Sequence, residues 1–250
     1  MEFETKKILV ADDNKSFLMY MAILLRRMGF NVLLAENGME ALKLIKQMHP
    51  DVVLLDCMMP KLDGMSVLRF LRSDIEAANI GIVMMSSNPK TLLDSEKFEC
   101  CGLLPKPVQI EDLHENLQNC IFKPMGFTRK HLRIPFNDKV SVTFDDKRHD
   151  LFAESLSEGG IYIRKKDPFP VSSKLDISLN LKGKATLDFH GNVIYIKGLY
   201  ADLYRVPPGM AIEFQNMQPD NAALLKSYIK EYLAGDIWED QEDTYIGKRT

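Results

Sequence analysis

Apolar residues follow two alternating patterns in the first half of the chain. Short, nearly continuous apolar runs alternate with segments in which apolar residues recur every three or four positions, as Leu18, Met21 and Leu25 do. The runs occupy residues 7–11, 31–35, 52–56, 81–86 and 102–104. Continuous runs of this length are typical of buried strands, and the longer spacing is typical of amphipathic helices. Five such units predict an α/β domain with a doubly wound, five-stranded parallel sheet.

The spacing of apolar residues changes after residue 127. The segments "VSVTF" (140–144) and "KLDISLNL" (174–181) alternate apolar and polar residues, which is the pattern of strands with one buried face. Further short runs occupy 161–163, 192–196 and 210–214. Together they predict a small antiparallel β-barrel. Apolar and aromatic residues at helical spacing between 224 and 233 predict a C-terminal helix that packs on or beside this barrel.

These patterns divide the chain into four parts. We expect an α/β domain over residues 5–122, a linker over 123–127, a barrel with its helix over 128–234, and a tail over 235–250. The tail is acidic and then polar, a composition that predicts mobility.

Composition narrows the class of protein. The chain has 250 residues, of which 46% are hydrophobic and 27% charged, which suits two globular domains with separate cores. No apolar run approaches the roughly 20 residues of a membrane span, and the first residues are too acidic for a secretory signal. We therefore expect a cytoplasmic protein without membrane insertion. The net charge of −3 offers little attraction to nucleic acid, so DNA is not an expected partner.

The four cysteines are Cys57, Cys100, Cys101 and Cys120. They have neither metal-ligand spacing nor a paired framework. In a cytoplasmic protein this predicts reduced, mostly buried thiols.

Carboxylates stand at the ends of two predicted strands. Asp12 and Asp13 follow the first run, and Asp56 ends the third. Because the carboxyl ends of parallel strands meet at one edge of a sheet, we expect these side chains to converge. Three adjacent carboxylates repel one another unless a hard dication lies among them, and Mg²⁺ prefers carboxylate oxygens. The sequence therefore predicts a magnesium site.

The same edge carries groups that suit phosphoryl transfer. An aspartate beside Mg²⁺ can attack phosphorus and form an acyl phosphate if positive charge offsets the incoming oxygens. Lys106, after the fifth run, supplies that charge, and Ser86, at the end of the fourth, supplies a hydroxyl. A single aspartate after a strand is usually a turn or cap residue. Four separate strand ends each carry a group that phosphoryl transfer requires, and this combination favours a functional site over turn or cap roles.

The first half resembles the receiver domain of two-component response regulators, which has a flavodoxin-like fold. The similarity rests on the segments "ILVADDN", "VVLLDCMMPKLDGM", "IVMMSS" and "LLPKPV". It implies that Asp56 accepts a phosphoryl group from the phosphohistidine of a sensor histidine kinase. It also implies that Asp12 and Asp13 hold Mg²⁺ with Asp56 and the backbone carbonyl of Met58, while Lys106 pairs with the phosphate.

Two residues qualify this interpretation. The family often has Tyr or Phe three positions before the lysine, as a rotameric partner of the switch hydroxyl, but this chain has Leu103. The haloacid-dehalogenase-like phosphatases require a second aspartate two residues after the nucleophile. Met58 stands there, so this alternative is rejected.

Two arginines and a turn suggest a ligand for the second half. Arg129 and Arg133 precede Pro135, which disfavours a helix and makes an ordered arginine loop plausible. The turn "SLSEGG" (155–160) offers serine hydroxyls, and its glycines let the backbone approach a ligand closely. Guanidinium groups fork onto phosphate and onto the edge of guanine. A phosphorylated guanine nucleotide fits, although a solvated arginine pair and an ordinary turn remain alternatives.

The second half resembles a PilZ domain. Arg129 and Arg133 match its RxxxR element, "SLSEGG" matches its (D/N)xSxxG element except at the first position, and "PPGMAIEF" resembles its closing strand. This resemblance implies binding of cyclic di-GMP by the two arginines, with Ser157 and Gly160 on the opposite lip. Ser155 replaces the Asp or Asn that accepts from guanine, so affinity falls by up to about tenfold.

Together the two halves predict a response regulator that is not an enzyme and that controls a downstream protein. One alternative is a docking adaptor whose barrel binds no nucleotide. A second alternative, a DNA-binding transcriptional regulator, ranks last because no helix-turn-helix pattern follows the receiver. The sequence leaves open the cognate kinase, the target and the formation of a homodimer.

Overall fold

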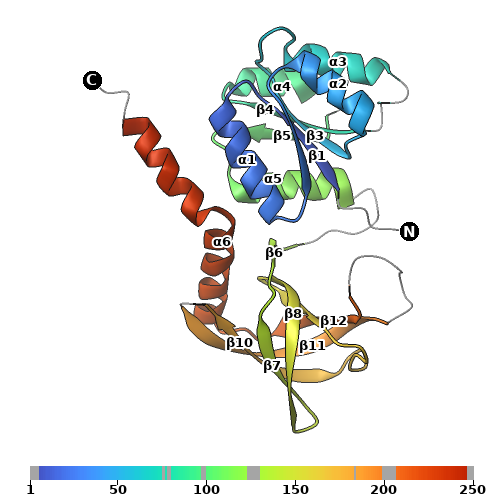
Figure 1. Cartoon of the computed structure of the whole chain (residues 1–250), viewed down its shortest axis with the longest axis vertical. Coiled ribbons are helices and arrows are strands. Elements are labelled where there is room, and N and C mark those ends of the chain that lie inside the picture. Colours follow the sequence, from blue (N-terminus) through green and yellow to red (C-terminus); the bar gives the residue numbers. More distant parts are fainter. Residues whose placement is uncertain are drawn as a thin grey trace. The chain divides into compact units, whose positions relative to one another are not determined.

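The computed structural model describes residues 6–74, 77, 80–96, 100–122, 130–182, 184–198 and 207–246, with side chains except at 93–96, 122 and 236–246. The chain divides into two compact units, residues 5–129 and residues 130–250 with 1–4 (Figure 1). Each unit has its own β-sheet.

The first unit alternates strands and helices. Its elements are β1 (Lys7–Ala11), α1 (Lys15–Arg27), β2 (Asn31–Ala35), α2 (Gly38–Met48), β3 (Val52–Asp56), α3 (Gly64–Ser73), β4 (Gly81–Ser86), α4 (Pro89–Glu96), β5 (Gly102–Pro105), α5 (Ile110–Leu117) and the π-helix η1 (Gln118–Phe122). The strands are parallel and lie in the order β2-β1-β3-β4-β5. This order is flavodoxin-like and confirms the predicted doubly wound sheet.

Local sequence explains where these elements begin and what they bury. The side chains of Asn14, Asn37 and Asp63 accept hydrogen bonds from backbone N–H groups in the first turns of α1, α2 and α3. β3 is central, and all five of its residues are buried. Figure 1 shows α1 and α5 on one face of the sheet and α2 and α3 on the other, which explains why the middle residues of the strands are apolar.

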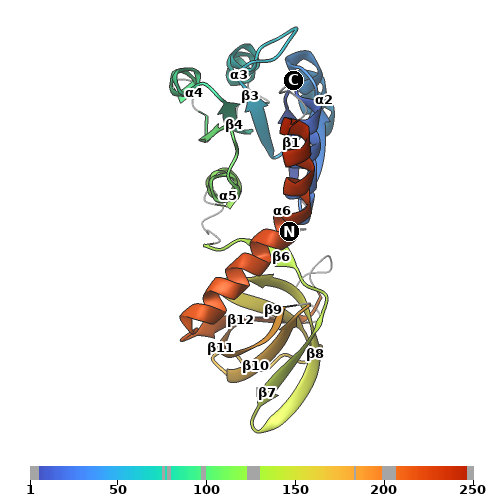
Figure 2. The ribbon, with the colours of Figure 1, turned by 90° about the vertical axis from the view of Figure 1, so that its left-hand side faces the viewer.

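The second unit is a barrel. Its elements are β6 (Arg133–Pro135), β7 (Lys139–Phe144), β8 (Lys147–Ser157), β9 (Gly160–Arg164), β10 (Lys174–Leu181), β11 (Ala185–Lys197), β12 (Gly209–Gln215) and α6 (Pro219–Ile246). The strand order is β6-β8-β7-β10-β11-β12-β9, and a pairing of β8 with β9 closes a ring of six antiparallel strands. Figure 2 shows this ring from the side. The predicted antiparallel barrel is confirmed.

The barrel core follows the alternation seen in the sequence. Along β10, Leu175, Ile177, Leu179 and Leu181 are buried, whereas the intervening polar residues face outward. Helix α6 contacts β6 of the barrel, and its apolar residues Leu225, Ile229 and Leu233 are fully buried. The predicted packing of the helix on the barrel is thus observed.

The C-terminal helix is longer than the predicted one. α6 continues to Ile246, through most of the stretch 235–250 for which the sequence suggests a mobile tail. Glu and Gln recur in this stretch and favour a helix even without an apolar face. Within the described part of the chain, no helix combines the length and hydrophobicity that a membrane crossing requires. The predicted linker 123–127 and Arg129 lie outside the described residues.

The prediction of four reduced thiols is wrong for two of the cysteines. Cys101 and Cys120 form a disulfide, with Cα atoms 5.7 Å apart, while Cys57 and Cys100 carry thiols. The pair is 19 positions apart in sequence. Only the return of α5 along β5 brings the two residues within bonding range, so spacing alone does not reveal the bridge.

Candidate functional site

The predicted carboxylates converge at the carboxyl edge of the parallel sheet. Asp12 and Asp13 follow β1, and Asp56 is the last residue of the neighbouring β3. One oxygen from each carboxylate lies within 4.8 Å of the others. Asp12 and Asp56 are buried, whereas Asp13 is exposed, so the cluster opens to solvent on one side.

Lys106 reaches this cluster from the end of β5. Its Nζ atom lies 2.5 Å from Oδ2 of Asp12 and 3.1 Å from Oδ2 of Asp56. The same ammonium lies 4.7 Å from the centre of the Phe17 ring, a contact on α1 that sequence reasoning missed. One cation therefore balances two buried carboxylates, and an aromatic face covers it.

The backbone holds Ser86 and Lys106 side by side. The N–H of Lys106 donates to the carbonyl oxygen of Ser86 at 3.0 Å. The buried Ser86 hydroxyl oxygen accepts from the N–H of Asn88 at 3.0 Å. The structure thus brings a hydroxyl and an ammonium to the edge that carries Asp56.

The electrostatics of Asp56 reflect its burial. Desolvation raises the pKa of the Asp56 carboxyl above its usual range, the nearby Lys106 ammonium opposes this, and the Asp12 carboxylate adds to it. The net direction is upward. A carboxylate with a raised pKa is more basic, and so more nucleophilic, than an exposed one.

The loop after Asp56 folds back tightly on β3. A Cβ atom on Gly64 would lie 2.0 Å from the carbonyl oxygen of Asp56, so only glycine fits there. The N–H of Gly64 donates to the carbonyl of Cys57 at 3.1 Å. The backbone N–H of Met58 donates to the Asp56 carboxylate, so this residue lies in the loop beside the cluster. The Met58 side chain is exposed.

Leu103 occupies the place where an aromatic residue often lies in receivers. It is half-buried on β5, packed against the apolar core under the sheet. Leu103 has no aromatic ring that could move between a buried and an exposed position. The chain therefore lacks the aromatic partner of the Ser86 hydroxyl at this position.

The barrel brings together most of the residues predicted to bind nucleotide. Arg133 begins β6, opposite Ser157 on β8, and its Nη1 donates to the Ser155 hydroxyl at 3.4 Å. The Ser157 hydroxyl donates to the carbonyl of Gly160 at 3.0 Å. Arg129, the other predicted arginine, lies outside the described residues.

The glycines of the turn have packing roles. A Cβ atom on Gly160 would lie 2.3 Å from the carbonyl oxygen of Ile212 on β12, and one on Gly159 would lie 2.6 Å from the His131 ring. Close packing of β9 against β12 thus requires glycine at 160 even without a ligand. His131, beside this turn and 3.9 Å from the Glu158 carboxylate, is a polar neighbour that the sequence motifs do not include.

Comparison with protein families agrees with both halves of the fold. The model of the response regulator receiver domain matches residues 8–118, and the model of the PilZ domain matches residues 127–231. The chain contains a receiver domain followed by a PilZ domain. Receiver and PilZ domains are signalling and binding domains.

Curated relatives share a limited part of the chain. "DNA-binding response regulator MtrA" of Mycolicibacterium smegmatis is 36% identical over 92 residues, 37% of this chain and 39% of that protein. "Probable transcriptional regulator ycf27" of Porphyra purpurea is 39% identical over 146 residues, 58% of each chain. The chain therefore spans less than two thirds of the length of these relatives.

Two receiver proteins are among the solved structures similar to the chain. The receiver domain of the Francisella response regulator 1452 is 30% identical, with a TM-score of 0.43, covering 49% of this chain and 99% of that chain. A response regulator receiver domain protein from Clostridium thermocellum is 29% identical, with a TM-score of 0.45, covering 48% of this chain and 97% of that chain.

Proposed function

We propose that the protein is a cytoplasmic response regulator that accepts a phosphoryl group on Asp56 and binds cyclic di-GMP through its PilZ domain. Its output is control of a downstream protein, and it is not an enzyme. The observation that carries the first half of this proposal is the position of Lys106, bound to both Asp12 and Asp56 beside a carboxylate cluster.

The donor set at this edge fits Mg²⁺. Asp12, Asp13 and Asp56 offer only carboxylate oxygens, one from each within 4.8 Å of the others, and the exposed Asp13 leaves room for the water ligands that Mg²⁺ retains. The backbone carbonyl of Met58 completes the proposed ligand set. When bound, the ion neutralises the charge that phosphate oxygens bring to the site.

The residues of the chain divide the transfer among them. An oxygen of Asp56 attacks the phosphorus of a kinase phosphohistidine, a P–O bond forms, the P–N bond breaks, and the imidazole leaves with its electron pair. The Lys106 ammonium pairs with the transferred oxygens, and the Ser86 hydroxyl donates to one of them. A sensor histidine kinase is the partner that this chemistry requires.

Labelling with a small phosphodonor tests the assignment. The protein is incubated with Mg²⁺ and acetyl phosphate, and its intact mass is measured. We expect one phosphate adduct, which disappears in Asp56→Asn and persists in Asp112→Asn, a control on α5. An adduct that persists in Asp56→Asn, or a parent protein that takes none, contradicts the proposal.

Arg133, Ser155 and Ser157 support the proposed nucleotide site, because they place a guanidinium and two hydroxyls together on β6 and β8. One observation favours the docking adaptor as a second candidate. Ser155 accepts from Arg133, and Ser157 and Gly160 satisfy each other, so these groups have partners without a nucleotide. Calorimetric titration with cyclic di-GMP separates the candidates, since the adaptor gives no binding heat.

A further inference from the structure

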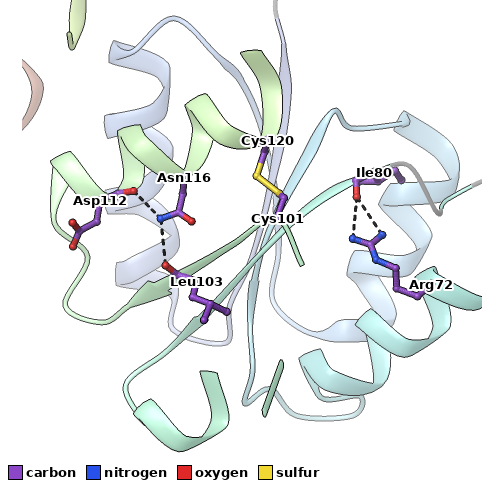
Figure 3. Close-up of a disulfide and its surroundings, with 7 residues drawn as sticks. All are labelled: Arg72, Ile80, Cys101, Leu103, Asp112, Asn116 and Cys120. Carbon is purple, nitrogen blue, oxygen red and sulfur yellow. Dashed lines mark hydrogen bonds between the residues drawn. A yellow bond between two sulfur atoms is a disulfide. The ribbon is translucent and has the colours of Figure 1, made fainter. Parts of the chain in front are cut away.

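The disulfide of the receiver domain joins two segments at the edge opposite Asp56. Cys101 immediately precedes β5, and Cys120 lies in the π-helix η1 (Figure 3). Both residues are half-buried, so solvent reaches this part of the fold. The bridge therefore connects the beginning of β5 with the last described element of the domain.

A hydrogen-bonded asparagine reinforces the connection between α5 and β5. The side-chain NH₂ of Asn116 donates to the carbonyl of Leu103 at 3.3 Å and to that of Asp112 at 2.9 Å (Figure 3). A Cβ atom on Gly102 would lie 1.7 Å from Oδ1 of Asn116, so glycine is needed for this approach. β5 is thus fixed by the bridge and by Asn116 at one end, and its other end leads to Lys106.

A third cysteine stands next to the bridge. Cys100 is half-buried and carries a thiol, whereas the thiol of Cys57 is buried in the core. The described domain therefore places a thiol and a disulfide at neighbouring positions on a partly exposed surface. Disulfides in cytoplasmic proteins are usually transient, because cellular thiols reduce them.

We propose that Cys101 and Cys120 form a reversible redox site whose reductant is a protein or small-molecule dithiol. A thiolate of the reductant attacks one sulfur of the bridge, the S–S bond breaks, and the departing cysteine thiolate takes a proton. The second thiol of the reductant then resolves the mixed disulfide. Two electrons and two protons reach the protein, which gains two thiols, and the reductant leaves as a disulfide.

The consequence of reduction is local release of η1. Without the bridge, η1 and the end of α5 are held by packing, chiefly of the buried Leu117 and Ile121. η1 directly precedes the predicted linker 123–127. Reduction therefore loosens the residues that lead out of the receiver, and oxidation holds them against the sheet. This inference rests on the proposed function, because a response regulator in the cytoplasm is exposed to thiols that can reduce the bridge.

The experiment uses the full-length protein in buffers with an increasing ratio of reduced to oxidised dithiothreitol, a small-molecule dithiol. Thiols are trapped with N-ethylmaleimide under denaturing conditions and located by mass spectrometry, and amide hydrogen exchange is measured over residues 118–122. We expect two labelled cysteines, Cys57 and Cys100, in oxidising buffer and all four in reducing buffer. Exchange over 118–122 rises at least about tenfold on reduction.

Serine variants provide matched controls. Cys120→Ser and Cys101→Ser each exchange like the reduced parent in every buffer, whereas Cys100→Ser keeps the bridge and the response. Four labelled thiols in oxidising buffer, a bridge between another pair, or unchanged exchange on reduction overturns the inference. Acetyl phosphate labelling of Asp56 in both redox states separates the two proposals. If Asp56 is labelled but no bridge forms, only the redox inference fails. If the bridge forms but Asp56 is not labelled, the assignment of Asp56 as phosphoacceptor fails.

Discussion

The ammonium of Lys106 lies closer to Asp12 than to the proposed phosphoacceptor, at 2.5 Å from the former and 3.1 Å from the latter. Both carboxylates are buried, and Lys106 is the cation that the structure places between them. Lys106 therefore has a structural role in addition to the proposed pairing with phosphate. Its removal leaves two buried, mutually repelling charges.

Lys106→Met should lower the stability of the receiver when Mg²⁺ is absent. We expect a loss of about 2–4 kcal/mol in the free energy of unfolding, somewhat below the cost of breaking a fully buried pair. Added Mg²⁺ should recover part of the loss, since it supplies the missing positive charge. Urea denaturation with and without Mg²⁺ measures both effects. Lys90→Met, at an exposed lysine on α4, is the control; equal effects of the two substitutions contradict the argument.

Phe17→Leu should slow labelling of Asp56 because the ring no longer attracts the Lys106 ammonium. A cation–π contact of about 0.5–1 kcal/mol corresponds to a roughly two- to fivefold change in rate. Phe17→Tyr keeps an aromatic face and should retain the parent rate. Phe70→Leu, on α3, is a matched control. The Phe70 ring also contacts a lysine, with Nζ of Lys46 at 5.1 Å from the ring centre. Initial rates with acetyl phosphate decide the outcome.

Alkaline pH should destabilise the PilZ domain through Tyr162. Burial, with smaller contributions from Tyr195 and Glu154, raises the pKa of Tyr162 from 10.0 to about 12, and its hydroxyl donates to the carbonyl of Pro207 at 2.8 Å. The folded state thus holds this proton more tightly than the unfolded state. The stabilisation is complete below pH 10 and is lost as the pH rises toward 12.

Tyr162→Phe provides the measurement of that effect. Near neutral pH the variant should be less stable by about 1 kcal/mol, the worth of one hydrogen bond. By pH 11 the parent should have lost about 1 kcal/mol more than the variant, so the two stabilities converge. Denaturation curves between pH 8 and 11 test this, with Tyr232→Phe on α6 as the control. A constant difference between parent and variant across this range shows that Tyr162 does not titrate as described.

The sequence predicted the site wherever topology determines it. Asp12 and Lys106 each follow a strand of one parallel sheet, Asp56 ends another, and all carboxyl ends of such strands meet at one edge. Strand endings alone therefore bring these residues together. Phe17 has no such signal, because its contact with Lys106 depends on how the side chains of α1 lie over the carboxyl edge of the sheet.

The missed features are those that depend on packing between distant segments. The Cys101–Cys120 bridge requires η1 to return to the beginning of β5, and no spacing rule encodes that distance. The need for glycine at 160 arises from the approach of β12, which lies some fifty positions later in the chain. The PilZ motif predicts that Gly160 contacts a ligand. The close approach of β12 shows that glycine is also needed there for packing.

Arg133→Ala should weaken binding of cyclic di-GMP. Loss of a hydrogen bond to a charged group costs about 1.5–3 kcal/mol, which is roughly a 10- to 150-fold increase in Kd. Arg129→Ala should behave similarly if both arginines of the RxxxR element bind the ligand. Arg148→Ala, at an exposed arginine on the distant end of β8, should leave the affinity unchanged. Calorimetry that detects parent-like binding after both substitutions places the ligand elsewhere or supports the docking adaptor.

Phosphorylation of Asp56 should change the affinity of the PilZ domain for cyclic di-GMP. The sequence supports this because Arg129 stands two positions after the segment 123–127, so ordering of the arginines around a nucleotide restrains the linker that ends the receiver. A typical coupling of about 1–3 kcal/mol shifts Kd roughly 5- to 150-fold, and Leu103, which replaces an aromatic switch partner, favours the lower end.

Coupling of this kind is reciprocal, which makes the test stringent. If beryllofluoride, a mimic of the phosphoryl group, tightens nucleotide binding by some factor, the nucleotide must favour beryllofluoride binding by the same factor. Calorimetric titrations of each ligand in the presence and absence of the other measure both factors. Asp56→Asn should abolish the beryllofluoride effect without altering the basal affinity for nucleotide. Equal affinities in all four titrations mean that the two domains bring separate signals to one partner without communicating.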